Sequence, residues 1–265
     1  MVEKRVAIAV RNLVKAFDGR RVLEDISLDI YEGETFVIMG GSGSGKSTLL
    51  RHMTGAIMPD AGKVFIGNRD LTSLSTDEKE KTKRRFGMCF QSAALLDSMS
   101  VEENVGLPLR EHTNLDAKVI NILVKMKLSL VGLQGFEKYM PSMLSGGMRK
   151  RAGLARAIAM DPEIIFYDEP TAGLDPIVCS VIDKLILDLN KKLHLTSIVV
   201  THNMESVFRI ADRVAMLYRG RLLQVGTREE IRNSDNPIVQ QFIKGEIEGP
   251  VQINDVSDVE TISEG

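Results

Sequence analysis

One glycine-rich stretch, residues 40–48, limits what this chain can fold into more than any other feature. It follows an apolar run, residues 35–39, that predicts a buried strand, and it precedes residues 49–53, which predict the first turns of a helix. A strand, a glycine loop and a helix in this order are the setting in which the pattern G-x-x-x-x-G-K-[ST] binds phosphate. Both flanks disfavour the alternative, an ordinary glycine turn with a chance lysine. The stretch predicts a nucleotide-binding α/β fold.

The residue types in this stretch explain how it would hold a nucleotide. Glycines let the backbone N–H groups point inward, and the helix start adds positive charge. Lys46 can reach the β- and γ-phosphates, the Ser47 hydroxyl can bind Mg²⁺, and Thr48 can donate to the α-phosphate. The predicted contacts are Gly40, Gly41, Ser42, Gly43, Ser44, Gly45, Lys46, Ser47 and Thr48.

Composition narrows the class of protein. The 265 residues carry a formal net charge of -2, which argues against binding nucleic acid through a general basic surface. No apolar run approaches the ~20 residues of a membrane span, and the start of the chain lacks the apolar region of a signal peptide. Cys89 and Cys179 lie far apart and outside any metal-ligand spacing, so we expect buried thiols in a cytosolic protein.

The rest of the pattern predicts strands alternating with helices. A hairpin is expected over residues 6–30 and another over 213–225, with a helical layer from 101 to about 138. Phe17 ends the first strand of the first hairpin. It is either a core aromatic or an exposed platform for adenine, and its place before a turn favours the platform.

Polar side chains follow three further predicted strands. Gln91 comes after residues 86–90, Asp168 and Glu169 after 163–167, and His202 after 197–200. Ligands bind beyond the carboxyl ends of strands in α/β sheets. Gln91 can offer an oxygen to Mg²⁺ or orient water, although alone it is more often a loop residue. Two adjacent carboxylates need a cation or a proton, so we expect Asp168 to hold Mg²⁺ through water and Glu169 to polarise the attacking water.

A second glycine-containing helix start follows the helical layer. Ser145, Gly146 and Gly147 can form another anion-binding nest, or simply a capped helix start. The next residues, 149–151, are all basic, which opposes the helix dipole. We therefore expect these cations to serve a partner rather than the stability of the helix.

The order of these motifs resembles the nucleotide-binding subunit of ABC transporters over about residues 5–243. Within that family the chain is similar to the ATPases of Mla/Mce-type lipid transport systems. The similarity lies in residues 109–113, in Leu-Ser-Gly-Gly-Met-Arg-Lys-Arg at 144–151, and in the helix from Pro237 to Phe242. The usual signature has glutamine where this chain has Met148, which cannot donate a hydrogen bond. We associate this methionine with the lipid branch.

The resemblance implies a P-loop NTPase fold: a RecA-like α/β core, an antiparallel β subdomain and an inserted helical subdomain at about residues 95–158. The nucleotide-binding domain would span residues 1–245, followed by an acidic extension, 246–265. ATP and Mg²⁺ would be the cofactors. Lys46, Gln91, Glu169 and His202 would be catalytic, and Ser47, Gln91 and Asp168 would bind the metal. The further nucleotide contacts implied are Phe17, Val22, Ser145, Gly146, Gly147, Asp168 and Asp175.

The resemblance also implies an assembly. Two copies would face each other head to tail, each Lys46 loop opposite the other copy's Ser145. The pair would drive an MlaE-like permease, together with an MlaD-like Mce protein and an MlaB-like STAS-domain protein. It would lie peripherally on the cytoplasmic face of the inner membrane of a Gram-negative cell, with no nucleic acid as partner. The implied function is ATP-driven phospholipid transport between the inner and outer membranes, which maintains outer-membrane lipid asymmetry.

Two other functions share the same catalytic residues. One is the ATPase of an ABC importer for polar solutes such as amino acids. The other is a soluble ABC ATPase of translation or DNA repair, which the single nucleotide cassette and the mild charge disfavour.

The acidic extension admits two interpretations. The first is a solvated, disordered tail. The second is an extended segment that buries alternate apolar side chains only when a partner, the other ATPase subunit or the STAS-like protein, is present. The second interpretation depends on recurring apolar residues, namely Ile247, Val251, Ile253, Val256, Val259 and Ile262.

Overall fold

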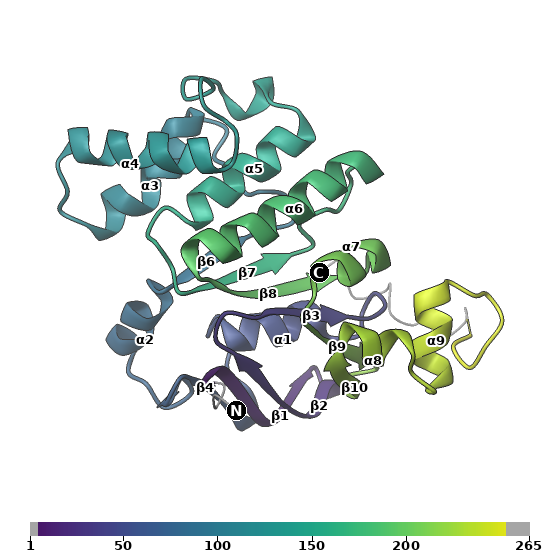
Figure 1. Ribbon diagram of the computed structural model, residues 1–265. Coiled ribbons are helices and arrows are strands. Elements are labelled where there is room, and N and C mark those ends of the chain that lie inside the picture. The colour runs from purple at the N-terminus through teal and green to yellow at the C-terminus, as the bar shows by residue number, and fades with distance from the viewer. Residues whose placement is uncertain (1–4, 253–265) are drawn as a thin grey trace. The chain divides into compact units, whose positions relative to one another are not determined.

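The computed structural model describes residues 5–252 (Figure 1). The chain divides into two compact units. The first contains the residues up to 74 together with those from 200 onward, and the second contains residues 75–199. No helix among residues 5–252 is long and apolar enough to cross a membrane.

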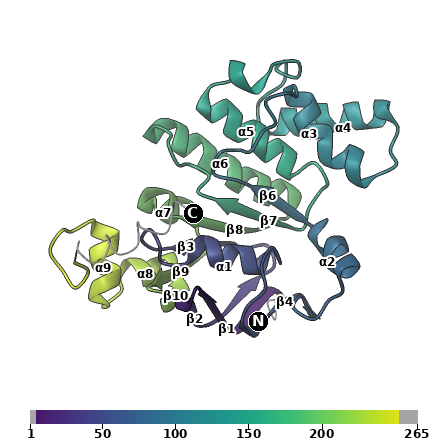
Figure 2. The same ribbon diagram turned by 180° about the vertical axis from the view of Figure 1, so that it is seen from behind.

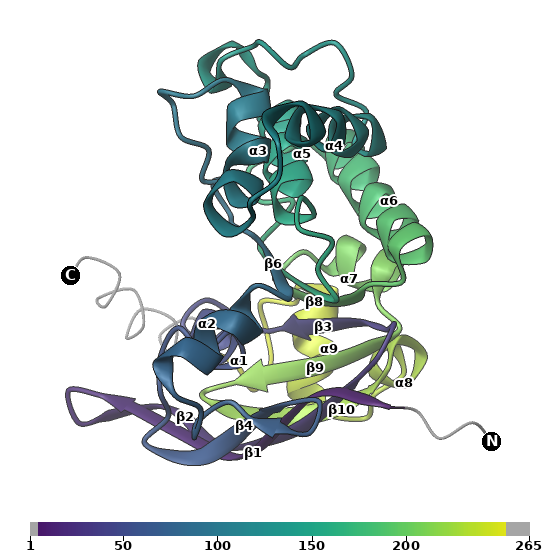
Figure 3. The same cartoon turned by 90° about the vertical axis from the view of Figure 1, so that its left-hand side faces the viewer.

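An antiparallel sheet in the first unit contains the predicted N-terminal hairpin. Its strands are β1 (Val6–Phe17), β2 (Arg20–Tyr31), β4 (Ala61–Ile66) and β5 (Arg69–Asp70), in the order β2-β1-β4-β5 (Figure 3). Val10 pairs with Leu28 on one side and with Val64 on the other. All three side chains are buried, so this register places the apolar alternation of the strands on the core.

The phosphate-loop strand also belongs to the first unit. All five residues of β3 (Thr35–Met39) are buried, as a strand covered on both faces requires. β3 pairs in parallel with β9 (Arg213–Tyr218), and β9 pairs antiparallel with β10 (Arg221–Thr227). The helices of this unit are α1 (Lys46–Met53), α7 (Met204–Ile210), α8 (Arg228–Arg232) and α9 (Pro237–Lys244) (Figure 2).

The second unit contains parallel β-strands. β6 (Phe86–Cys89) pairs in parallel with β7 (Ile164–Asp168), and β8 (Thr196–Thr201) follows β7 in the strand order. The helices beside them are α2 (Thr76–Lys83) and α6 (Pro176–Leu193), in which Pro176 occupies the first turn. Tyr167 and Phe166 of β7 are fully buried, so this strand is central to the core of the unit.

The predicted helical layer consists of α3 (Val101–His112), α4 (Ala117–Leu130), the short 3₁₀ helix η1 (Pro141–Met143) and α5 (Gly146–Ala157). Asp116 caps α4 by accepting from the backbone N–H of Lys118. Ser100 caps α3 in a reciprocal capping box with Glu103. Val105, Val124 and Leu128 are buried where these helices pack.

The predicted fold class and nearly all predicted elements are confirmed. Both cysteines are free and buried, as expected. The sequence analysis missed β5 and η1, whose two and three residues are too short to show a period.

Candidate nucleotide-binding site

Residues 40–48, the phosphate loop, link β3 to α1 as the sequence predicts. Lys46 is 8% exposed, and its ammonium donates to the carbonyl oxygens of Gly40, at 2.9 Å, and Gly41, at 2.8 Å. A Cβ on Gly40 would lie 2.1 Å from the carbonyl oxygen of Leu217 in β9. Only glycine therefore fits where the loop leaves the sheet, and the loop wraps around the lysine head group.

The start of α1 differs from that of the other α-helices between residues 5 and 252. Gly45, in a left-handed conformation (φ 102°), occupies the cap position and offers no side-chain acceptor to the first N–H groups. A side chain accepts a hydrogen bond at the start of each of α2 to α9. The first N–H groups of a helix attract anions when no side chain caps them. This start therefore suits a phosphate group.

Phe17 and Val22 lie on the antiparallel sheet of the same unit. Phe17 is 44% exposed, which excludes the core-aromatic alternative, and the Lys15 ammonium lies 5.2 Å from its ring centre. A Cβ on Gly45 would lie 2.9 Å from the carbonyl oxygen of Val22. The structure thus brings the start of β2 against the phosphate loop, beside the strand that ends in an exposed aromatic ring.

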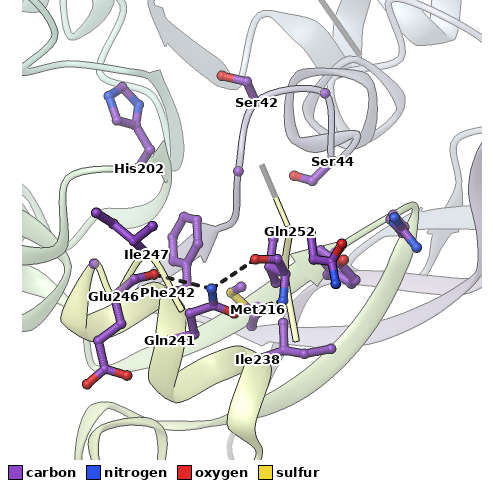
Figure 4. A pocket seen from close by; sticks show the side chains of 16 residues that line it. Ser42, Ser44, His202, Met216, Ile238, Gln241, Phe242, Glu246, Ile247 and Gln252 are labelled. Carbon is purple, nitrogen blue, oxygen red and sulfur yellow. Dashed lines mark hydrogen bonds between the residues drawn. The ribbon is translucent and has the colours of Figure 1, made fainter. Parts of the chain in front are cut away.

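A cavity of about 560 Å³ opens beside the phosphate loop, within the first unit (Figure 4). His202, which is exposed, lines it together with residues 41–44. Its other walls come from the end of β9, from α9 and from the segment that follows α9. The structure therefore places the predicted His202 near the predicted phosphate loop.

The first part of the acidic extension packs on its own chain. The Gln241 amide donates to the carbonyl oxygens of Glu246, at 3.2 Å, and Val251, at 2.9 Å, and accepts from the Val251 N–H at 2.8 Å (Figure 4). Val251 is half-buried, whereas Ile247 is 78% exposed. Glu246 and Val251 thus contact α9 through Gln241. The remaining apolar residues of the extension, between 253 and 262, lie outside the described residues.

The second unit holds the polar residues that follow β6 and β7. Gln91 is exposed after β6, Asp168 is half-buried at the end of β7, and Glu169 is buried. Glu169 adopts a left-handed conformation (φ 47°), which a residue with a side chain rarely does. Ala93 (φ 61°) and Ala94 (φ 47°), just after Gln91, do the same. The loops after both strands are therefore strained, as is common at functional sites.

The predicted second glycine nest begins α5 in the same unit. The Ser145 hydroxyl accepts from the N–H of Met148 at 3.3 Å, so Ser145 is the helix cap. A Cβ on Gly147 would lie 2.7 Å from a methyl group of Val178 in α6. Asp175 caps α6 by accepting from the N–H groups of Ile177 and Val178, both at 3.0 Å. Ser145 thus forms the capped helix start that the sequence analysis gave as the alternative, and Asp175 has a structural role that it did not assign.

The three cations that follow Gly147 have partners in their own chain. Arg149 donates to the carbonyl oxygen of Leu144 and Arg151 to that of Gly132, while Lys150 donates to those of Gln91 and Glu169. The expectation that these residues serve a separate partner is therefore unnecessary. Burial lowers the pKa of Lys150. Sequence reasoning missed its contacts because they join residues far apart in the chain.

Comparison with known families identifies the class of protein. The ABC transporter family model matches residues 23–172, more than half of the chain, and the chain belongs to this family. It is therefore an ATPase of the ABC transporter class, a class that binds nucleotide.

Individual relatives are also similar over most of their length. The intermembrane phospholipid transport system ATP-binding protein MlaF of Haemophilus influenzae is 44% identical over 245 residues, which cover 92% of this chain and 93% of MlaF. The probable ribonucleotide transport ATP-binding protein mkl of Mycobacterium leprae is 42% identical over 259 residues, covering 98% and 75%. A dimeric structure of the ATP-binding cassette MJ0796 with ADP and Pi has a TM-score of 0.76 at 32% identity, covering 83% and 98%.

Proposed function

We propose that this chain is the ATP-hydrolysing subunit of an ABC transporter that moves phospholipid between the inner and outer membranes and so maintains outer-membrane lipid asymmetry. The observation that carries the proposal is the identity of 44% to MlaF over nearly the full length of both chains. The phosphate loop and the strained loops after β6 and β7 supply the groups that ATP hydrolysis needs.

The residues of the first unit would bind the nucleotide. Phe17 presents an exposed ring on which adenine can stack, and Val22 lies against the phosphate loop. The loop N–H groups and the uncapped start of α1 would hold the phosphates. Lys46, already directed at the centre of the loop, would contact the β- and γ-phosphates, and His202 would orient the γ-phosphate and the water.

The residues of the second unit would carry the hydrolytic step. Glu169 would accept the proton of the attacking water as it approaches the γ-phosphorus, because it follows the end of β7, where ligands bind in α/β sheets. Ser145, Gly146, Gly147 and Asp175 would contact ATP held by a second copy of the chain. The dimeric MJ0796 cassette supports this two-chain arrangement.

Mg²⁺ fits the chemistry of the proposed ligands. Ser47, Gln91 and Asp168 each offer an oxygen, and all three are at least partly exposed. Mg²⁺ prefers oxygen and is usually held by one or two carboxylates together with substrate phosphates. Residues 5–252 contain no cluster of three or more histidine, cysteine or acidic residues that could hold an ion alone. When bound, Mg²⁺ supplies positive charge against the β- and γ-phosphate oxygens.

The partners are proposed from the resemblance to Mla/Mce-type systems, and the relatives named MlaF support it. The proposed assembly is a dimer of this chain with an MlaE-like permease, an MlaD-like Mce protein and an MlaB-like STAS-domain protein. It would lie on the cytoplasmic face of the inner membrane of a Gram-negative cell, attached through the permease.

A polar-solute importer is the second candidate, favoured by the mycobacterial relative whose name refers to ribonucleotide transport. The two candidates differ in their partners. Purifying the chain with its bound subunits from detergent-solubilised membranes should yield an Mce-domain protein and co-purifying phospholipid. Recovery of a periplasmic solute-binding protein instead would favour the importer, and recovery of ribosomes or DNA would contradict both.

Replacing Glu169 by glutamine tests the chemical half of the proposal. Glu169→Gln should keep ATP binding and slow hydrolysis by about 10²–10⁴-fold, because it removes the general base. Phosphate release and binding of a fluorescent ATP analogue measure the two effects. Near-normal turnover would show that Glu169 is not the base.

A further inference from the structure

Two loops of the second unit are held in strained conformations. They are the Gln91 loop, residues 91–94, and the Glu169 loop, residues 169–172. Ala93, Ala94 and Glu169 all have left-handed backbones. Such a conformation is unfavourable for a residue with a side chain and persists only when the surroundings impose it. Something in the unit must therefore hold both loops.

Two cations of α5 bind the carbonyl groups of these residues. Lys150 donates to the carbonyl oxygen of Gln91 and, at 3.2 Å, to that of Glu169. Arg156 donates to the carbonyl oxygens of Ala93, at 2.9 Å, and Ala94, at 2.6 Å. The main-chain oxygen of every strained residue in the two loops thus accepts a hydrogen bond from one of these cations.

The two cations lie on one face of α5. Lys150, Gly153 and Arg156 are spaced three residues apart, which places them on the same side of a helix. A Cβ on Gly153 would lie 3.0 Å from the Cβ of Ala93, so the helix backbone touches the Gln91 loop between the two cations. Lys150 is 7% exposed. A buried ammonium is costly unless its hydrogen bonds are made, so its two carbonyl contacts specify its position.

We propose that Lys150 is a positioning residue, and that the face formed by Lys150, Gly153 and Arg156 holds the Gln91 and Glu169 loops in the conformation that hydrolysis requires. This rests on the proposed function, in which Gln91 and Glu169 act on ATP. Lys150 donates to both loops, so it links the proposed metal ligand Gln91 to the proposed base Glu169. It also ties both to the helix that begins at Ser145.

Lys150→Met, which keeps most of the side-chain volume but removes the ammonium, tests this role. Lys127→Met is the matched control, because Lys127 is an equally buried lysine of the same unit that pairs with Asp161 and touches neither loop. Lys150→Met should lower kcat by about tenfold to a hundredfold, the effect of a small misplacement of reacting groups, and leave ATP affinity unchanged. Lys150→Arg should recover part of the loss, and Lys127→Met should leave kcat unchanged.

Amide hydrogen exchange provides a second readout that needs no nucleotide. The Ala93 N–H donates to Phe90 and the Ala172 N–H donates to Glu169, so both report on loop conformation. Lys150→Met should speed exchange at both amides, whereas Lys127→Met should change neither. Unchanged kcat, or a lower kcat with unchanged exchange at both amides, would overturn the proposal. If hydrolysis does not depend on Glu169 in the protein with Lys150 intact, the proposed function is overturned instead. The exchange result would still show whether Lys150 holds the two loops.

Discussion

Two helices of this protein begin in glycine-rich sequence, and they use glycine for different reasons. α1 begins after Gly45, whose left-handed backbone and missing side chain leave the first N–H groups uncapped. α5 begins with Gly146 and Gly147 inside the helix, after a serine that caps it. The first start needs glycine for backbone conformation and close approach. The second needs it for space against α6.

The cations near the two starts also differ. Lys46 turns back onto the loop that precedes its helix. Lys150 turns away from its helix start and binds the loops after β6 and β7. A similar composition thus leaves one helix start uncapped and directs the cation of the other to the loops after β6 and β7. The following predictions test this contrast.

Removing the Lys46 ammonium should have the largest effect. Lys46→Ala should lower ATP hydrolysis by roughly 10²–10³-fold, because it removes a charge that we propose contacts the phosphates. Phosphate release measures the loss, and circular dichroism checks the fold. If the variant unfolds, the bonds of Lys46 to Gly40 and Gly41 are structural, and the two helix starts are less different than proposed.

Mixing variants tests whether the two starts meet across a dimer. Lys46→Ala and Ser145→Arg should each be inactive alone. A heterodimer would carry both lesions in one site and leave the other intact, so part of the ATPase activity should return on mixing. The measurement is phosphate release against the mixing ratio. Full activity in a strictly monomeric preparation would contradict the two-chain site.

Adding a methyl group at each start should separate the two uses of glycine. Gly40→Ala places a Cβ against a backbone oxygen and should lower the free energy of unfolding by about 3 kcal/mol. Gly147→Ala meets only the Val178 side chain, and alanine is the better helix former by about 0.5–1 kcal/mol. Its net effect should be small.

The double variant Gly147→Ala/Val178→Ala sharpens this comparison. Without the Val178 methyl groups, alanine at 147 should stabilise the protein relative to Val178→Ala alone, by about 0.5–1 kcal/mol. Chemical denaturation of the four proteins measures the coupling. If Gly40→Ala and Gly147→Ala lower the free energy of unfolding equally, the two helix starts do not use glycine for different reasons.

The comparison of the two helix starts also shows which features of the structure could be predicted from the sequence. The phosphate loop and the strand-end residues are local patterns, and the structure has them where the sequence indicates. The roles of Lys150 and Gly147 depend on Gln91, Glu169 and Val178, which are distant in the chain. No periodic pattern in the sequence reveals such contacts. The sequence analysis therefore predicted that the cations after Gly147 serve a separate partner.

The smallest expected effect is a pH dependence that belongs to α1. His52 is buried, its Nδ1 lies 2.7 Å from the Thr48 carbonyl oxygen, and burial lowers its pKa. An unfolded histidine titrates near pH ~6.5, so below that pH the unfolded chain binds a proton that the folded chain resists. The contribution of His52 to stability should be complete above pH ~6.5 and be lost as the pH falls toward its lower folded value.

Comparing His52→Asn with the wild type isolates this contribution, because an asparagine amide can still donate to Thr48. The charged neighbours of His52 are Lys15 and Asp60, and the pKa of Asp60 is itself lowered, first by its hydrogen bond to Lys15. The lowered pKa of Asp60 keeps this carboxylate ionised between pH 5 and 7, so His52 should set the difference. Between about pH 7 and pH 5 the wild type should lose stability faster than the variant, by at most about 1.4 kcal/mol per pH unit. His112→Asn, at an exposed histidine of α3, should keep the wild-type slope. If stability falls equally steeply with pH in His52→Asn and in the wild type, α1 tolerates a protonated His52. The sensitivity of this region to a change in charge would then be confined to the phosphate loop.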